Sequence, residues 1–165
     1  TDIGEDFGSG RMFLPQVLLS AETMRAAFDK IKELIPASAE ATKGTVVLAT
    51  VKGDVHDLGK NIVGALMANS GFKVIDLGKD IAPEEIVEAV LREKADICGL
   101  AALMTTTMPQ IDKTVAALHA KKSTAKVMIG GAAVTADYVE ISGADCYAGD
   151  AVHAVRLAKE MLGID

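Results

Sequence analysis

The stretch "TVVLATVKGDVHDLGKNIVG" (residues 45–64) decides the fold, because it joins two different hydrophobic periodicities. Residues 45–50 form an apolar run typical of a buried strand. From residue 60 onward the apolar residues take a helical spacing. Between them lies "KGDVHDLG" (52–59), which predicts a turn from strand to helix and places a histidine between two aspartates.

The rest of the chain repeats this strand-then-helix pattern. Strands are predicted at 45–50, 73–77, 96–101, 126–129 and 145–147. Helices are predicted near 60–70, 83–94, 109–121, 135–142 and 151–162, two of them starting at Pro83 and Pro109. Five such units predict an α/β fold, with a five-stranded parallel flavodoxin-like (Rossmann-like) sheet and helices on both faces.

In a sheet of this kind, ligands bind beyond the carboxyl ends of the strands, where the strand order reverses. The loops that reach this edge are predicted at 51–59, 78–82, 102–108, 130–134 and 148–150. If the strand order is 2-1-3-4-5, the reversal lies between the loops that follow the first and third strands.

Residues 1–36 differ from the rest in being helical, with Pro15 suited to a first helical turn and Pro36 to a stop. So short a helical segment cannot bury its own apolar face. We therefore expect it to be the C-terminal part of a larger helical cap truncated upstream, or to pack on the rest of the chain. Residues 37–44 are interpreted as a linker, and residues 45–165 as the α/β domain.

Composition excludes several classes of partner. The chain has 165 residues, a net charge of −6 and a pI near 5.1. Such an acidic chain is poorly suited to bind nucleic acid or an anionic membrane. No apolar run is long enough to span a membrane, and no signal-peptide pattern opens the chain. Cys98 and Cys146 are expected to be buried free thiols, which indicates a reducing cytoplasm.

The first loop resembles a degenerate phosphate loop, since Gly53 precedes Gly59 and Lys60. The spacing is one residue too long, and Asn61 replaces the hydroxyl that binds Mg²⁺. Aspartates in the loop would also face a triphosphate. A zinc site is a second alternative, but no further His or Cys stands at a usable spacing. A third is that His56 is an ordinary surface histidine among turn residues.

A fourth alternative makes Asp54 the orienting partner of His56, because a metal-bound imidazole generally donates its second N–H to a carboxylate. A single protein ligand then suffices if a macrocycle already holds the metal. Small or hydroxyl-bearing residues follow two other strands, at Thr105–Thr107 and Gly130-Gly131. Together they indicate a slot that admits an extended ligand at this edge.

These motifs resemble the D-x-H-x-x-G … S-x-L … G-G signature of cobalamin-binding domains. The matching residues are Asp54-x-His56-x-x-Gly59, the loop around Leu103, and Gly130-Gly131. "FLPQVLLSAETM" (13–24) is similar to the helical cap that precedes such domains in methionine synthase and in the corrinoid proteins of methyltransferase systems. One residue departs from the signature: Ala101 stands where the family has the S-x-L serine, which puts a polar contact to the cobamide tail in doubt.

The resemblance implies roles for individual residues. A cobalamin or related cobamide would bind base-off, with His56 as the lower cobalt ligand, Asp54 as its hydrogen-bonded partner and Thr107 extending the relay. Phe13, with Leu18 and Met24, would cover the upper cobalt face. The other cofactor-binding residues that the resemblance implies are Val55, Asp57, Gly59, Ile62, Ala101, Leu103, Thr105, Gly130, Gly131 and Tyr147.

The function that the resemblance implies is that of a methyl carrier. Its cobalt would alternate between Co(I) and CH3–Co(III) as the protein shuttles methyl groups between a donor and an acceptor methyltransferase, with a reductive activase as a further expected partner. The chain shows no complete active site of its own. Alternatives are a cobalamin-binding fragment of methionine synthase, a cobalamin-sensing regulatory module, and an isomerase subunit.

Overall fold

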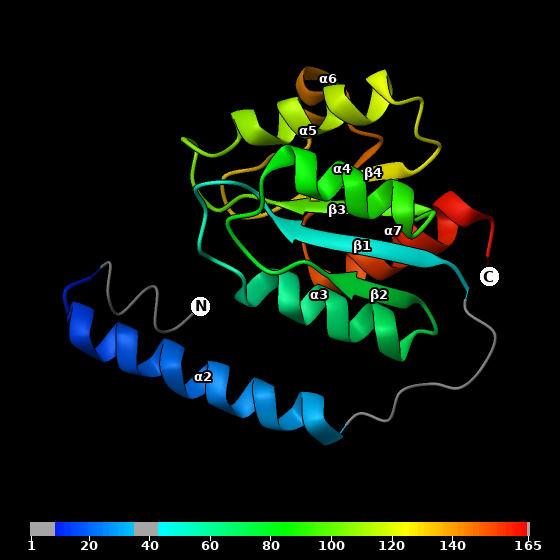
Figure 1. Cartoon of the computed structure of the whole chain (residues 1–165). Coiled ribbons are helices and arrows are strands. Elements are labelled where there is room, and N and C mark those ends of the chain that lie inside the picture. The colour runs from blue at the N-terminus through cyan, green and yellow to red at the C-terminus, as the bar shows by residue number, and fades with distance from the viewer. Residues whose placement is uncertain (1–8, 35–42, 165) are drawn as a thin grey trace. The chain divides into compact units, whose positions relative to one another are not determined.

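The computed structural model of the chain describes residues 9–34 and 43–164. The chain divides into two compact units, Thr1–Pro36 and Ala37–Asp165. The first unit contains the helix α2 (Leu14–Leu34), drawn in blue in Figure 1. Pro36 and most of the predicted linker lie outside the described residues.

The second unit is built on a five-stranded parallel sheet (Figure 1). Its strands are β1 (Thr45–Thr50), β2 (Lys73–Asp76), β3 (Ile97–Ala101), β4 (Lys126–Gly130) and β5 (Cys146–Ala148). They are ordered β2-β1-β3-β4-β5, and every pair is parallel. The predicted fold class is therefore confirmed, and the order reverses between β1 and β3, where a ligand is expected.

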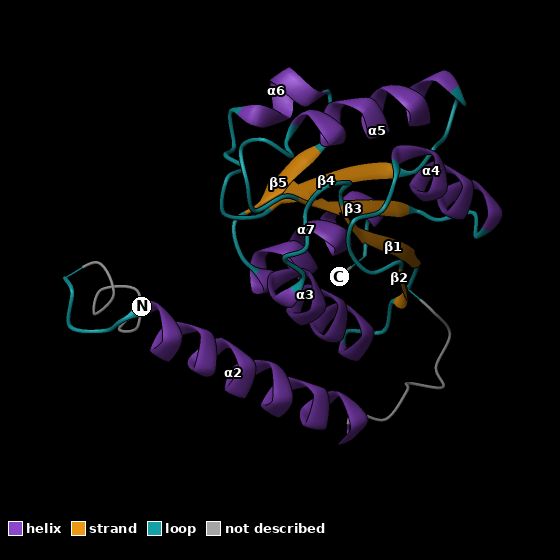
Figure 2. Cartoon of the chain, turned by 60° about the vertical axis from the view of Figure 1, so that its left-hand side comes forward, coloured by secondary structure: helices purple, strands orange, loops and turns teal. Residues whose placement is uncertain are grey.

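Helices cover both faces of the sheet (Figure 2). On one face α3 (Leu58–Asn69) packs beside α7 (Ala151–Leu162). On the other, α4 (Pro83–Arg92) packs beside α5 (Pro109–Ala120), which contacts the short α6 (Tyr138–Ser142). The proline at the start of α4 and of α5 has no N–H to leave unpaired there, which explains why both helices begin where the sequence predicts.

The interior strand β1 shows how the sheet is stabilised. Val47 and Ala49 belong to the hydrophobic core beneath α4 and α5, whereas Val46 and Leu48 belong to the core beneath α3 and α7. All four are at most 2% exposed. Since successive side chains of a strand point to opposite faces, a strand covered on both faces must be apolar throughout. Thr50, the polar last residue of β1, is also buried.

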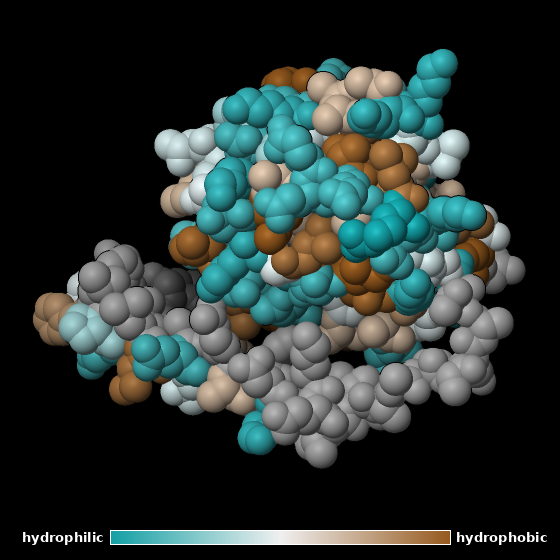
Figure 3. Space-filling model, viewed as in Figure 1, coloured by the Kyte–Doolittle hydropathy of each residue, from teal (hydrophilic) through white to brown (hydrophobic). Residues whose placement is uncertain are grey.

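The surface of the α/β domain mixes hydrophilic and hydrophobic residues in the view of Figure 3, with hydrophobic ones reaching the surface over the middle of this face. In the described part of the chain, no helix combines the length and the apolar character needed to cross a lipid bilayer.

Candidate functional site

The loop after β1 begins with a tight turn. The Asp54 N–H donates to the Val51 carbonyl at 3.1 Å, and Gly53 between them has a φ of 83°. This backbone conformation favours glycine, because a side chain there would crowd the backbone. The turn places the Asp54 carboxylate fully inside the protein, at the edge of the sheet where the strand order reverses.

Asp54 is the centre of a hydrogen-bond network. Its Oδ1 accepts from the main-chain N–H of His56 at 3.0 Å and lies 2.8 Å from His56 Nδ1. Its Oδ2 accepts from the Leu103 N–H at 2.7 Å and the Thr107 hydroxyl at 2.9 Å, and lies 3.3 Å from the Met104 nitrogen. The carboxylate therefore ties the loop after β1 to the loop after β3.

Burial raises the pKa of Asp54, but the hydrogen bonds overcome this effect. Main-chain donors on His56 and Leu103, together with the side chains of His56 and Thr107, hold the pKa at about 2, against an ordinary 3.8. Asp54 is thus ionised at neutral pH and can only accept hydrogen bonds. A buried carboxylate of this kind is stabilised by its donors rather than by water.

The ionised Asp54 determines which tautomer His56 adopts when its ring is neutral. Because Oδ1 can only accept, the proton of the imidazole lies on Nδ1, and Nε2 keeps its lone pair. The His56 side chain is 47% exposed, whereas that of Asp54 is 0% exposed. A half-exposed imidazole held from behind by a buried carboxylate has the donor arrangement of a metal ligand.

Two hydroxyl groups complete the support of this pair. The buried Thr50, the last residue of β1, donates from Oγ1 to the His56 carbonyl at 3.2 Å. The buried Thr107 places its Oγ1 2.8 Å from the Met104 carbonyl as well as beside Asp54. The end of β1 and the loop after β3 therefore both restrain the segment that carries the histidine.

Lys60 does not serve the loop as a phosphate-loop lysine would. Its side chain is 2% exposed, pairs with Asp76 Oδ1 at the end of β2, and donates to Asn61 Oδ1 at 2.9 Å. An ammonium committed in this way is not free to reach a phosphate. Among residues 9–34 and 43–164, no group of three or more His, Cys, Asp or Glu is placed to hold a metal ion by itself.

The remaining predicted site residues lie along the same edge of the sheet, apart from Tyr147, which is part of β5. Val55, next to His56 in the chain, and Leu103, whose N–H donates to Asp54, are large apolar residues that stay 55% and 42% exposed. Thr105 is exposed in the loop before α5, and Ala101 ends β3 in register with Thr50. In the described structure, the Asp54 network includes neither Thr105 nor Tyr147. Asp57, Gly59 and Ile62 lie at the start of α3.

Gly130, the last residue of β4, and Gly131 after it are both crowded by the protein's own backbone. A Cβ on Gly131, whose φ is 115°, would stand 2.1 Å from the Ala102 carbonyl oxygen. A Cβ on Gly130 would stand 3.0 Å from the Ala148 carbonyl oxygen. The sequence had suggested that these glycines leave room for a ligand. The structure shows that the close approach of the Ala102 backbone already demands a glycine at 131 and that the Ala148 carbonyl leaves little room at 130, whereas Gly59 faces open space.

Gly131→Ala is expected to lower the free energy of unfolding by about 2 to 3 kcal/mol, because it adds both left-handed strain and a backbone clash. Gly163→Ala is the matched control: its φ is 65°, but a Cβ there meets nothing within 4 Å. Urea unfolding of the cobamide-free protein measures both. Equal losses of unfolding free energy in the two variants would show that the Ala102 backbone does not exclude a side chain at position 131.

Sequence reasoning missed two residues that bond to the loop, Thr50 and Asp80 after β2, and the pairing of Lys60 with Asp76. A polar residue at the end of an apolar strand was the available signal for Thr50. For Asp80 the only available signal was its position in a loop at the ligand-binding edge of the sheet. The pairing of Lys60 with Asp76 spans 16 positions, and no sequence periodicity reports it.

Comparison with known proteins decides the family. The model of the B12 binding domain matches residues 44–158, which include the whole of this network, and a second B12 binding domain model matches residues 1–32. The chain belongs to the B12-binding corrinoid proteins. Dimethylamine corrinoid protein 1 of Methanosarcina acetivorans is 42% identical over 98% of this chain and 77% of its own length.

Solved structures agree with this assignment. The monomethylamine corrinoid protein of Methanosarcina barkeri is 32% identical, with a TM-score of 0.83 over 96% of this chain and 76% of its own. The methanol:cobalamin methyltransferase complex of the same organism contains a chain that is 37% identical, with a TM-score of 0.72 over 98% of this chain and 62% of its own. The resemblance seen in the sequence is confirmed, and the protein binds a cobamide.

The residues present fit such a cofactor. The arrangement offers one imidazole nitrogen with a free lone pair, and a metal that is already held by a macrocycle needs only one ligand from the protein. The exposed Val55 and Leu103 provide apolar surface on the two loops that Asp54 joins. Gly59 opens the approach from the side of α3. A flat apolar ring system is compatible with all three features.

Proposed function

We propose that this protein carries methyl groups for a methylamine-dependent methyltransferase system. Its relatives include dimethylamine and trimethylamine corrinoid proteins of Methanosarcina at 40 to 42% identity. When bound, the cobamide supplies a cobalt that accepts a methyl group from a donor and yields it to a nucleophile. The observation that carries the role of the cofactor is the buried Asp54 bonded to a half-exposed His56, and the relatives carry the choice of methylamines.

In this proposal His56 would hold the cobalt of the cobamide through Nε2, the ring nitrogen that does not face Asp54. Asp54 holds the Nδ1 proton and the orientation of the ring, and Thr107 and Leu103 hold Asp54 in turn. Because Asp54 is fixed on both oxygens, the imidazole is preorganised before any cofactor arrives. Gly130 and Gly131, together with the half-buried Ala101, are proposed to border the slot for the nucleotide tail.

Methyltransferases are the partners of a corrinoid protein, and we propose a donor and an acceptor enzyme together with a reductive activase that restores oxidised cobalt. The free thiols of Cys98 and Cys146 support a reducing compartment such as the cytoplasm.

The proposal is tested by methyl transfer to the reduced, cobamide-loaded protein. Methyltransferases specific for dimethylamine, trimethylamine, monomethylamine and methanol are added in turn, each with its own substrate, and the loss of Co(I) absorbance is followed. We expect a methylamine enzyme to react at least about tenfold faster than the methanol enzyme, a difference of about 1.4 kcal/mol in the barrier.

Methyl iodide serves as the control, because it methylates accessible Co(I) without a partner enzyme. Reaction with methyl iodide but with none of the amine enzymes would overturn the assignment to methylamines. If no enzyme reacts while the cobamide stays bound, the methyl-carrier function is wrong and a sensing role replaces it.

A further inference from the structure

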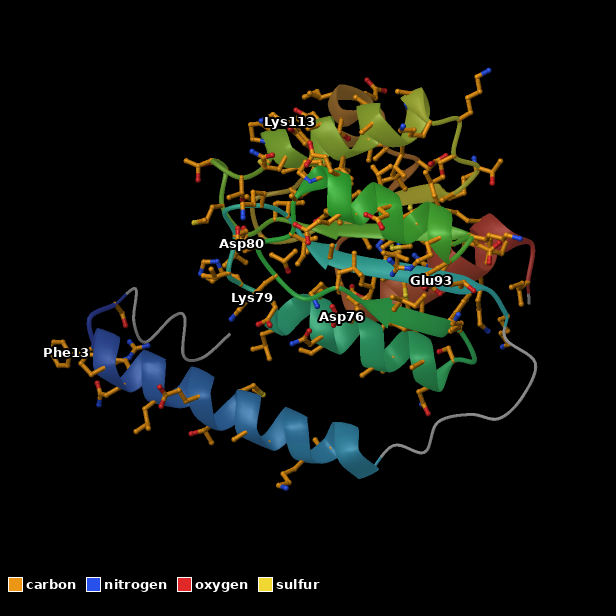
Figure 4. The ribbon with its side chains drawn as sticks, viewed as in Figure 1. Phe13, Asp76, Lys79, Asp80, Glu93 and Lys113 are labelled. Atoms are coloured by element: carbon orange, nitrogen blue, oxygen red, sulfur yellow. The ribbon has the colours of Figure 1, made fainter. Side chains whose placement is uncertain are left out.

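The loop after β2 reaches the turn that carries Asp54 and holds it from a second side. Figure 4 labels Asp80 in this loop, beside the segment that leaves β1. The Asp80 backbone is left-handed, with a φ of 60°. Such a conformation is uncommon for residues other than glycine, and aspartate and asparagine tolerate it best. A residue keeps such a conformation only when its contacts hold it there.

Asp80 makes two hydrogen bonds to the same peptide segment. Its carboxylate Oδ1 accepts from the Gly53 N–H at 2.8 Å, and its own N–H donates to the Asp54 carbonyl at 3.0 Å. The two bonds hold consecutive residues of the turn. Asp54 is therefore restrained through its side chain by the loop after β3, and through its main chain by Asp80 after β2.

The carboxylate of Asp80 also lies 3.2 Å from Lys52 Nζ, but this ion pair does not explain the arrangement. The two side chains are 47% and 53% exposed, and ion pairs at such positions contribute little to stability. The Gly53 N–H is the main cause that lowers the pKa of Asp80. The bond to the turn is thus the specific contact, and any good acceptor at this position can make it.

We propose that Asp80 is a positioning residue for the axial histidine: it fixes the turn at Gly53 and Asp54, so that the Asp54–His56 pair stays aligned toward the cobalt. The inference rests on the proposed role of His56. The loop after β2 thereby influences how strongly His56 binds the cobalt. Asp80 acts from outside the side-chain hydrogen bonds that join Asp54 to His56 and Thr107.

Two substitutions separate the hydrogen bond from the backbone conformation. Asp80→Gly removes the acceptor and keeps the left-handed backbone free of strain. Asp80→Asn keeps an oxygen acceptor and also tolerates this backbone. Lys94→Gly is the matched control, because Lys94 has a φ of 50° and follows α4 at the other end of the strands. Both positions are at the surface, and urea unfolding checks that each of the three variants folds.

Two readouts are measured on the full chain at one fixed pH. In the cobamide-free protein, Asp80→Gly is expected to speed hydrogen exchange at the Gly53 amide about tenfold. In the protein loaded with hydroxocobalamin and reduced to Co(II), the ratio of histidine-ligated to unligated cobalt is read from nitrogen splitting in the electron paramagnetic resonance spectrum. We expect Asp80→Gly to lower this ratio about three- to tenfold, and Asp80→Asn and Lys94→Gly to stay within about twofold of the parent chain.

The outcomes distinguish this inference from the function on which it rests. If the parent chain shows no nitrogen splitting, His56 is not the cobalt ligand, and the positioning role of Asp80 is then wrong as well. Normal splitting in the parent chain together with equal ratios in Asp80→Gly and Lys94→Gly would overturn the role of Asp80 alone. Loss of ligation in Asp80→Asn as large as in Asp80→Gly would also contradict it, since the acceptor is retained there.

Discussion

His56→Ala is expected to abolish nitrogen ligation of the cobalt while leaving the fold intact. The side chain is 47% exposed, so its removal creates no buried cavity, and the unfolding free energy should change by less than about 1 kcal/mol. The ring is the proposed lower ligand, so the spectrum of the bound cobamide should change to that of a form with water or no ligand below the cobalt. Enzyme-driven methyl transfer should fall by about a hundredfold or more, because ligand orientation is lost.

His119→Ala is the matched control for this variant. His119 lies in the last turn of α5 and is exposed, and it takes no part in the Asp54 network. Absorption and electron paramagnetic resonance spectra of the loaded proteins give the comparison directly. An unchanged spectrum in His56→Ala would mean that another group binds the lower face, and the assignment of His56 would be wrong.

Asp54→Ala is expected to give the largest loss of stability of the changes considered, about 3 to 5 kcal/mol in the free energy of unfolding. The main-chain donors of His56 and Leu103 and the Thr107 hydroxyl all point at a carboxylate that is 0% exposed. Without it, buried donors lose their partner and the two loops lose their connection. Urea unfolding of the cobamide-free protein measures the loss.

Asp54→Asn should be intermediate, because an amide offers one acceptor oxygen but sets an NH2 group against the donors on the other side. Thr107→Val provides the matched control. It deletes one of the donors and should cost only about 1 kcal/mol. If Asp54→Ala costs no more than Thr107→Val, the carboxylate is not the centre of the network.

The pH dependence of stability gives an independent check on Asp54. Its pKa is about 2 in the folded protein against an ordinary 3.8, so its contribution is fully present above pH 4 to 5. As the pH falls through 3.8 toward 2, the unfolded chain takes up the proton first and about 2 kcal/mol of stability is lost. The difference in unfolding free energy between the parent chain and Asp54→Asn should shrink over that range. A constant difference between pH 6 and pH 2.5 would contradict the lowered pKa.

The hydrophobic periodicity of the sequence predicted the local structure of this protein. The apolar run of β1, the alternation of strands with helices, and the prolines at the starts of α4 and α5 are short-range signals, because strand and helix geometry repeat within a few residues. The predicted strand at 45–50 matches β1, and the other four differ from the observed strands by one residue at one or both ends. The helix predicted at 135–142 forms only from Tyr138, since Thr135 and its neighbours make a turn first.

The candidate site was only partly predictable. Asp54 and His56 are two residues apart in one loop, so their pairing followed from the motif. Thr107 entered through the resemblance to cobalamin-binding domains, since no local pattern relates it to Asp54 across 53 positions. Asp80, Thr50 and the pairing of Lys60 with Asp76 escaped prediction altogether.

By itself, then, the sequence determined the α/β class, the strand-to-helix turn at 52–59 and the family that its motif indicates. Only the tertiary structure decided which loops meet at the sheet edge. The order β2-β1-β3 brings the loops after β2 and β3 to opposite sides of the turn that carries Asp54. Strand register also sets Gly131 against Ala102. Such contacts depend on how distant strands are ordered and aligned, and hydrophobic periodicity does not record either.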